Sequence, residues 1–189
     1  MQPRPAWRVW GDLIRAAIGL GSVGLLAIGA SGVVAEAFGA AFGRGFVAGD
    51  PSGVTYSKAR CAEYMEYAPD AHSCAEAATT HHFGEVVEYR VAAGVLGLIG
   101  LGVWWLLRRR THRPGVLPEA FSATVATALF TVAAAGLLLE SIGLAVIGGE
   151  SNGVGALLSG GLVSAVAAAA FGLVLWRSLL SRAERLATV

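Results

Sequence analysis

Two glutamates lie within or directly beside long apolar stretches of the sequence, where carboxylates are rare. Glu140 is the only charged residue between positions 120 and 147, a stretch long enough to cross a bilayer. Glu36 follows directly after the apolar run 16–35. Because a carboxylate inside a membrane is costly, we expect each one to be retained for a reason. The alternatives are a protonated or hydrogen-bonded group that serves helix packing or lies at the outer interface, a proton or cation relay, and a contact to the charge of a partner subunit.

The same spacing of glycines surrounds both glutamates, at 32–39 and at 136–143. Each segment reads glycine, three apolar residues, glutamate, two residues, glycine. On a helix these glycines share a face with the glutamate, and such a small face lets a neighbouring helix approach closely. We therefore predict that Glu36 and Glu140 face other helices rather than lipid. The recurrence also suggests an internal repeat of one helical hairpin about an axis along the membrane normal, with chance recurrence in a glycine-rich chain as the alternative.

A histidine and carboxylate cluster directly precedes the second apolar run and consists of His81, His82, Glu85 and Glu88. On a helix His81, Glu85 and Glu88 lie on one face. An imidazole and a carboxylate four residues apart can hold zinc or another divalent metal. The order differs from the E-x-x-H pairs of metal-binding four-helix bundles. A solvated acidic face and a pH-sensing histidine pair are the alternatives to a metal site.

The chain has two cysteines, Cys61 and Cys74, and both fall in the polar segment 54–90. On the oxidising side of a membrane such a pair favours a structural disulfide. A redox pair is the alternative, although the spacing is not C-x-x-C. The sequence contains no nucleotide-binding loop, no H-E-x-x-H and no Ser-His-Asp arrangement, so it predicts neither a catalytic site nor a cofactor.

The composition places the chain among membrane proteins. Hydrophobic residues make up 55% of it and charged residues 14%, against about 25% charged residues in soluble domains. The net charge of +1 provides no basic field for nucleic acid, so the expected partners are the lipid bilayer and other membrane proteins. Lys58 is the only lysine, a usage typical of GC-rich genomes, and we expect a bacterial-type plasma membrane.

The predicted fold is all-α: a polytopic membrane protein whose four transmembrane helices form two consecutive hairpins, with a small helical extracytoplasmic loop. The expected segments are a cytoplasmic N-terminal anchor (1–15), a first span (16–40), an extracytoplasmic helical loop (41–85), a second span (86–107), a cytoplasmic loop (108–118), a third span (119–147), an extracytoplasmic turn (148–154), a fourth span (155–176) and a cytoplasmic tail (177–189). We expect the amphipathic tail to lie along the membrane surface.

Local signals refine two of these segments. The residues 35–37 have the small-x-small form of a signal-peptide cleavage site, but the apolar run before them is longer than the about 7–15 residues of a signal peptide. We therefore expect an uncleaved first span. In the outer loop, 57–67 predicts a short helix that ends near Pro69. Ser73 and Glu76 then form the S-x-x-E capping box of a helix that runs into the second span.

The arginines predict the topology. The N-terminus, the 108–113 turn and the C-terminal tail hold ten of the fourteen basic residues, whereas acidic residues outnumber basic ones in the 44–90 loop. The positive-inside rule then places both termini in the cytoplasm and the acidic loop outside.

Three functions are compatible with these features. We favour an accessory, structural or interaction subunit of a membrane assembly, which would co-purify with other chains. The alternative is a proton- or cation-coupled transporter that uses Glu36 and Glu140, which would show flux after reconstitution. The second alternative is a metal-binding membrane protein or enzyme with a site at the outer membrane end, which would carry stoichiometric metal. An enzyme would have to be built from the glutamates and histidines alone, so we favour a protein without catalytic activity.

Overall fold

The structure is a computed structural model that describes residues 6–49, 55–110, 116–147 and 153–187, with side chains described for 10–49, 55–109, 122–146 and 153–177. All regular structure in these ranges is helical. The helices are α1 (Ala6–Phe42), α2 (Arg44–Ala48), α3 (Lys58–Tyr67), α4 (Cys74–Arg110), α5 (Val116–Ile147) and α6 (Val154–Ala187). Four of them are long and apolar enough to cross a membrane, with candidate spans Trp10–Phe42, Cys74–Arg109, Ser122–Val146 and Val154–Arg177.

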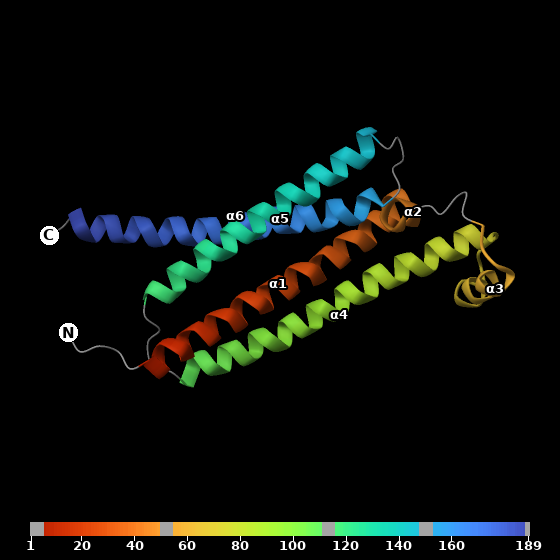
Figure 1. The fold of residues 1–189 in the computed structure, drawn as a ribbon. Coiled ribbons are helices and arrows are strands. Elements are labelled where there is room, and N and C mark those ends of the chain that lie inside the picture. The colour runs from red at the N-terminus through yellow and green to blue at the C-terminus, as the bar shows by residue number, and fades with distance from the viewer. Residues whose placement is uncertain (1–5, 50–54, 111–115, 148–152, 188–189) are drawn as a thin grey trace.

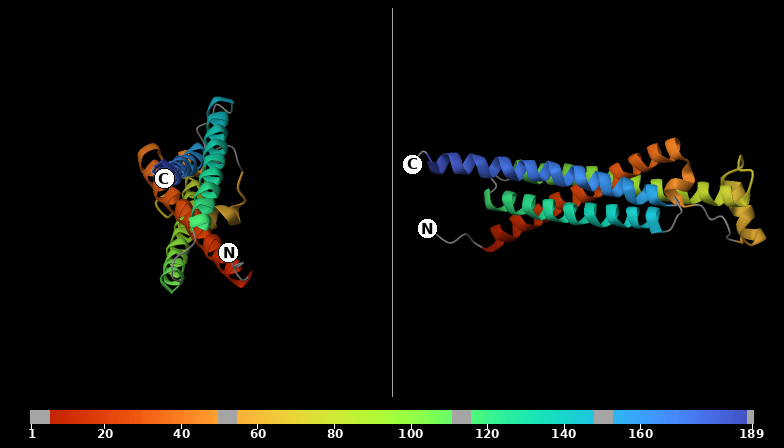
Figure 2. Two further views of the ribbon diagram at one scale, coloured as in Figure 1. Left: turned by 90° about the vertical axis from the view of Figure 1, so that its left-hand side faces the viewer. Right: turned by 90° about the horizontal axis from the view of Figure 1, so that it is seen from above.

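The long helices form two antiparallel hairpins, as the sequence predicts. In the first hairpin α1 packs along α4, and in the second α5 packs along α6, while α6 also contacts α1. The start of α1, the end of α4, the start of α5 and the end of α6 lie at one end of the bundle, and α2 and α3 lie at the other (Figure 1). Seen from above, the four long helices run in roughly one direction, whereas the view from the side shows that they cross one another at an angle (Figure 2).

Glycines bring α1 and α4 close together. A Cβ placed on Gly94 would lie 2.9 Å from the Cα of Gly29, and a Cβ on Gly29 would collide with the Cα of Gly94. A Cβ on Gly97 would lie 2.7 Å from the backbone nitrogen of Leu26. Larger residues would therefore force the two backbones apart, which is the usual role of small residues in membrane helix packing.

The helix α1 ends where Gly43 adopts a φ of 91°, a conformation that favours glycine. The five residues of α2 follow and fold back on the bundle, where Val47 is buried. Phe46 of α2 meets the rings of Phe38 and Phe42, with ring centroids 6.0 and 5.2 Å away. An aromatic cluster therefore closes this end of α1.

The polar loop forms a small helical cap over the start of α4. Ser57 caps α3 by accepting a hydrogen bond from the Arg60 backbone nitrogen at 3.3 Å. At the start of α4, Ser73 Oγ accepts from the Glu76 backbone nitrogen at 3.2 Å. The Glu76 carboxylate accepts in return from the backbone nitrogen of His72, at 2.8 Å. The predicted short helix and the predicted capping are both confirmed, with His72 rather than Ser73 as the second donor.

The C-terminal tail differs from the expectation. The expected separate surface segment is absent from the described residues, because the helix α6 continues past Trp176 to Ala187 without a break. An unbroken helix keeps its axis, so the tail extends the fourth span (Figure 1). Parts of the expected N-terminal anchor (1–5), cytoplasmic loop (111–115), extracytoplasmic turn (148–152) and C-terminal tail (188–189) lie outside the described residues.

Candidate functional site

The two glutamates lie on the outer surface of the single chain. Glu36 of α1 and Glu140 of α5 are both exposed. In each helix the residue next to the glutamate is buried instead: Ala35 is 0% exposed and Ser141 is 1% exposed. Successive helix residues differ by about 100° in direction, so a buried neighbour turns the glutamate outward. The prediction that Glu36 and Glu140 face other helices of this chain is therefore wrong.

The glycines around the two glutamates have different surroundings. A Cβ on Gly32 would lie 2.8 Å from the Cβ of Arg90, and one on Gly39 would lie 2.6 Å from the Phe83 ring, so both belong to the seam between α1 and α4. Around Glu140, by contrast, a Cβ on Gly136 or Gly143 would meet no heavy atom of the described chain within 4 Å. The small face of α5 is therefore open.

The histidine cluster assembles at the start of α4, beneath the cap. His82 Nδ1 lies 3.2 Å from Glu85 Oε2, and His81 Nδ1 lies 3.7 Å from the same oxygen. One ligand atom from each of the three residues can be chosen so that all lie within 4.8 Å of one another. His81 Nδ1 is buried and has no hydrogen-bond partner in the described chain. The three residues could hold a divalent cation, whereas Glu88 lies exposed and outside this group.

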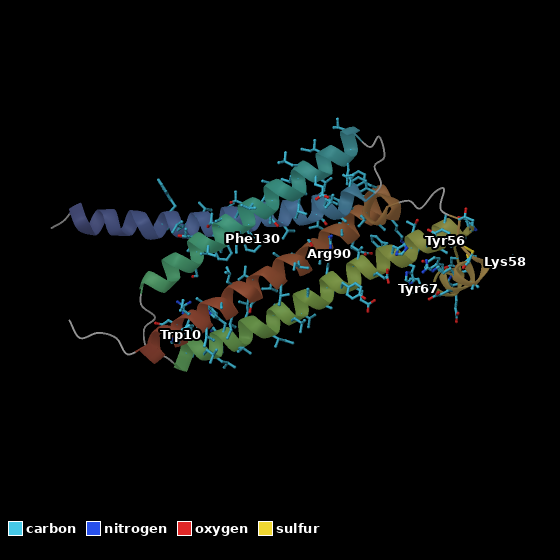
Figure 3. All side chains as sticks on the ribbon, in the orientation of Figure 1. Trp10, Tyr56, Lys58, Tyr67, Arg90 and Phe130 are labelled. Carbon is cyan, nitrogen blue, oxygen red and sulfur yellow. A yellow bond between two sulfur atoms is a disulfide. The ribbon has the colours of Figure 1, made fainter. Side chains whose placement is uncertain are left out.

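Two tyrosines of α3 support the cluster. The ring of His81 lies 5.2 Å from that of Tyr64 and 4.9 Å from that of Tyr67. Cys61 and Cys74 lie at disulfide distance, with their Cα atoms 5.4 Å apart, and this pair joins α3 to the first residue of α4. The predicted pairing thus fixes the tyrosine-bearing helix α3 against the start of α4, and Figure 3 labels Tyr67 at this place.

Arg90 is a half-buried cation that the sequence analysis missed. Its side chain comes from α4, crosses the bundle and donates from Nη1 to Ser159 Oγ at 2.7 Å and from Nη2 to the Ala156 carbonyl at 3.1 Å, both on α6. A longer contact of 3.5 Å joins Nη1 to the Ser31 carbonyl of α1. All three acceptors are neutral. Among the residues with described side chains, no carboxylate lies within 4.0 Å of the guanidinium.

A signal for Arg90 was present in the sequence. We counted Arg90 with the charges of the 44–90 loop, although it lies within the expected second span, 86–107, and we gave it no role there. It lies 18 residues before Arg108, however, which is about 27 Å along a helix. That is less than the about 30 Å of the hydrocarbon core, so a helix that begins at Cys74 brings Arg90 down to the edge of that core.

Arg90 reaches the end of an apolar crevice between the two hairpins. The crevice has a volume of about 590 Å³ and is lined by α1, α5 and α6. Its walls include Leu20, Ile28, Phe130 and Leu157. Such a volume lies within the range of about 300–1,000 Å³ for ligand sites, and one charged group in an apolar wall is typical of them.

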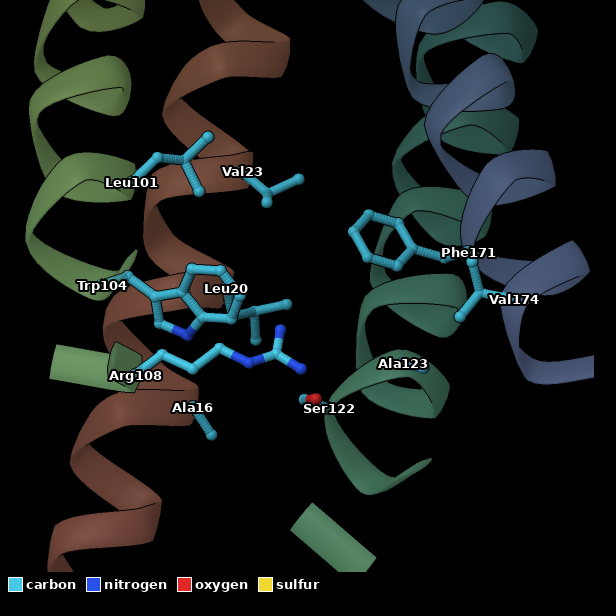
Figure 4. A pocket seen from close by; sticks show the side chains of 11 residues that line it. Ala16, Leu20, Val23, Leu101, Trp104, Arg108, Ser122, Ala123, Phe171 and Val174 are labelled. Atoms are coloured by element: carbon cyan, nitrogen blue, oxygen red, sulfur yellow. The ribbon is translucent and has the colours of Figure 1, made fainter. Parts of the chain in front are cut away.

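A second crevice of about 380 Å³ lies toward the other end of the bundle (Figure 4). Trp104 and Arg108 of α4 line it, with the guanidinium carbon of Arg108 5.1 Å from the centre of the Trp104 ring. Leu20 lines both crevices, so they adjoin at that residue.

Comparisons with protein-family models, with curated proteins and with solved structures found no match for this chain. Its function is therefore argued from its own residues.

Proposed function

We propose that this integral membrane protein is an accessory subunit that docks a transmembrane helix of another protein against the open face of α5. The observation that supports it is the exposure of Glu140 beside two glycines whose Cβ positions are empty. A carboxylate in a span is costly when it faces lipid. A partner helix that carries a lysine, an arginine or a hydroxyl group would remove that cost.

The depth of Glu140 fits such a contact. It lies seven residues before Ile147, the last described residue of α5, and thus at least about 10 Å along the helix from its end. The flanking Gly136 and Gly143 would let the partner backbone approach closely enough for a short side-chain donor to reach the carboxylate. A transporter receives less support, because a relay needs carboxylates along an internal path and both glutamates lie on the outer surface.

A size measurement in native lipid tests the proposal. We would extract the tagged protein into polymer nanodiscs and measure particle mass, comparing Gly136→Leu with Val166→Leu. Val166 lies on α6 and is 70% exposed, so its substitution alters a lipid-facing position away from Glu140. We expect a hetero-assembly that Gly136→Leu dissociates and Val166→Leu preserves. A wild-type protein that is monomeric, or that assembles only with copies of itself, would refute the proposal.

Metal binding at the cap is the second candidate. The supporting observation is the convergence of His81, His82 and Glu85, with the Nδ1 of His81 left without a partner. These are ligands that zinc and similar ions accept. The site would lie in the polar first turns of α4, before the apolar run 91–107. There a bound ion would brace the cap, and its three ligands alone give no support for catalysis.

A zinc titration separates a metal site from a solvated face. We expect the chelator-treated protein to bind one zinc ion, and His81→Ala to weaken binding by at least about tenfold. His72 is exposed and lies outside the group, so His72→Ala is the matched control. Equal affinities of the two variants would exclude the cluster as the binding site.

A further inference from the structure

Arg90 carries a charge that no acidic side chain of the described bundle balances. Its hydrogen bonds to Ser159, Ala156 and Ser31 reach neutral oxygens only. A guanidinium has five N–H donors, and these bonds leave donors for a further acceptor. Arg90 is half-buried, and cations that are even partly withdrawn from water between membrane helices are rare and usually paired, because desolvation without an anion is costly. The missing element is therefore an anion.

The position of Arg90 indicates where that anion would come from. Arg90 lies 18 residues before Arg108 on α4, and its partner Ser159 lies 18 residues before Arg177 on α6. Both separations are about 27 Å along a helix. If Arg108 and Arg177 mark one membrane interface, the Arg90 guanidinium lies near the other edge of the hydrocarbon core, where lipid headgroups begin.

The shape of the crevice supplies the second part of the ligand. Along α1 the crevice extends from Ser31, beside Arg90, to Leu20. These residues are 11 positions apart, or about 16 Å. Its mouth includes Ala133 and Leu129, which are exposed on the lipid-facing surface of α5. A long apolar slot with a cation at one end and a lateral opening matches a chain with an anionic head.

We propose that this crevice binds an anionic lipid, with the carboxylate or phosphate on Arg90 and one acyl chain along α1 toward Leu20. The fork of the guanidinium suits two oxygens of one anion. The ligand would add the charge that the bundle lacks and would fill the space between the two hairpins. This site is separate from the open face of α5 around Glu140, so the proposal does not depend on the docking of a partner helix.

Spin-labelled lipids test the proposal. The delipidated protein is reconstituted in phosphatidylcholine nanodiscs with spin-labelled stearic acid, phosphatidylglycerol or phosphatidylcholine, and the motionally restricted fraction is measured. We expect an anionic probe to associate about fivefold more strongly than the neutral one, the effect of one basic residue near the membrane surface. Preference for stearate or for phosphatidylglycerol identifies the carboxylate or the phosphate as the natural head. No preference for either would overturn the proposal.

Variants locate the site. Arg90→Gln should abolish the preference, whereas Arg44→Gln should keep it, because Arg44 lies on α2 at the same end of the bundle but does not line the crevice. Ala133→Trp should also abolish it by filling the crevice while Arg90 remains. If Arg90→Gln does not fold, the lipid preference of Ala133→Trp alone tests whether the crevice is the binding site. Retained preference in that variant would show that the anionic lipid binds elsewhere and would overturn the proposal.

Discussion

At the scale of single residues, the decisive property is the direction in which a side chain leaves its helix. Ala35 is fully buried, whereas Glu36 beside it is exposed. In the same way Ser141 is buried and Glu140 beside it is exposed. Successive residues point about 100° apart around the helix axis, so a shift of one position decides whether a carboxylate lies inside the bundle or on its surface. The glycine spacing around each glutamate did not carry that information, because glycines can face a neighbour or an open surface equally well.

Some residue contacts were predictable because they lie within one helix. His81 and Glu85 are four positions apart, and helix geometry alone brings their side chains together. Arg90 was not predictable in this way. Its acceptors Ser31, Ala156 and Ser159 come from two other helices, and their convergence depends on how the hairpins pack.

The Gly29 contact gives a test of packing at one residue. Gly29→Ala should destabilise the bundle by about 1–3 kcal/mol, because the added methyl group collides with the Gly94 backbone. Gly21→Ala on the same helix is the control, since a Cβ there meets nothing within 4 Å and alanine favours helix. The measurement is the unfolding midpoint in detergent. A loss of stability with Gly21→Ala equal to that with Gly29→Ala would contradict the close approach.

At the scale of elements, the helices and their caps follow from short patterns. The capping residues Ser57 and Ser73, the pair Cys61–Cys74 and the four apolar runs each lie within or beside the element that they define, and the structure contains all of them. The continuation of α6 to Ala187 was missed because the arginines of the tail indicated a membrane surface, and the same residues are compatible with a continuous helix.

The cap gives a test at this scale. In Cys61→Ser/Cys74→Ser the tether between α3 and α4 is lost, and closing a loop of 13 residues is worth about 3 kcal/mol. We expect amide exchange in α3 to accelerate strongly while exchange in α5 and α6 stays unchanged. The readout is hydrogen exchange followed by mass spectrometry. Protection in α3 equal to that of the wild type would show that packing of Tyr64 alone holds the cap.

At the scale of the molecule, the bundle has two chemically different ends. The disulfide and the histidine cluster lie at one end of α4, and Arg108 and Arg109 lie at the other, together with the start of α1 and the end of α6. The fold therefore separates the cysteines from the arginine-rich turn, as the sequence predicts. Which end faces the cytoplasm is a proposal that rests on the distribution of arginines.

Reporter fusions test this orientation. Alkaline phosphatase, which is active only outside the cytoplasm, should be active when fused after Glu66 in α3 and inactive when fused after Arg109. A fluorescent protein at the C-terminus, which matures in the cytoplasm, should show the complementary result. The reverse pattern would place the cap in the cytoplasm, where a disulfide would be hard to maintain.

The length of α6 has a consequence that reaches across the bilayer. Its 34 residues measure about 51 Å, well beyond the about 30 Å of the hydrocarbon core, so a helix that crosses the core must extend past one of its edges. Near its other end Ser159 is bonded to Arg90. Because an unbroken helix moves as a rod, a tilt that begins at Ser159 swings the protruding arm. A displacement of the Arg90–Ser159 contact would therefore also move the opposite end of α6, beyond the other edge of the hydrocarbon core.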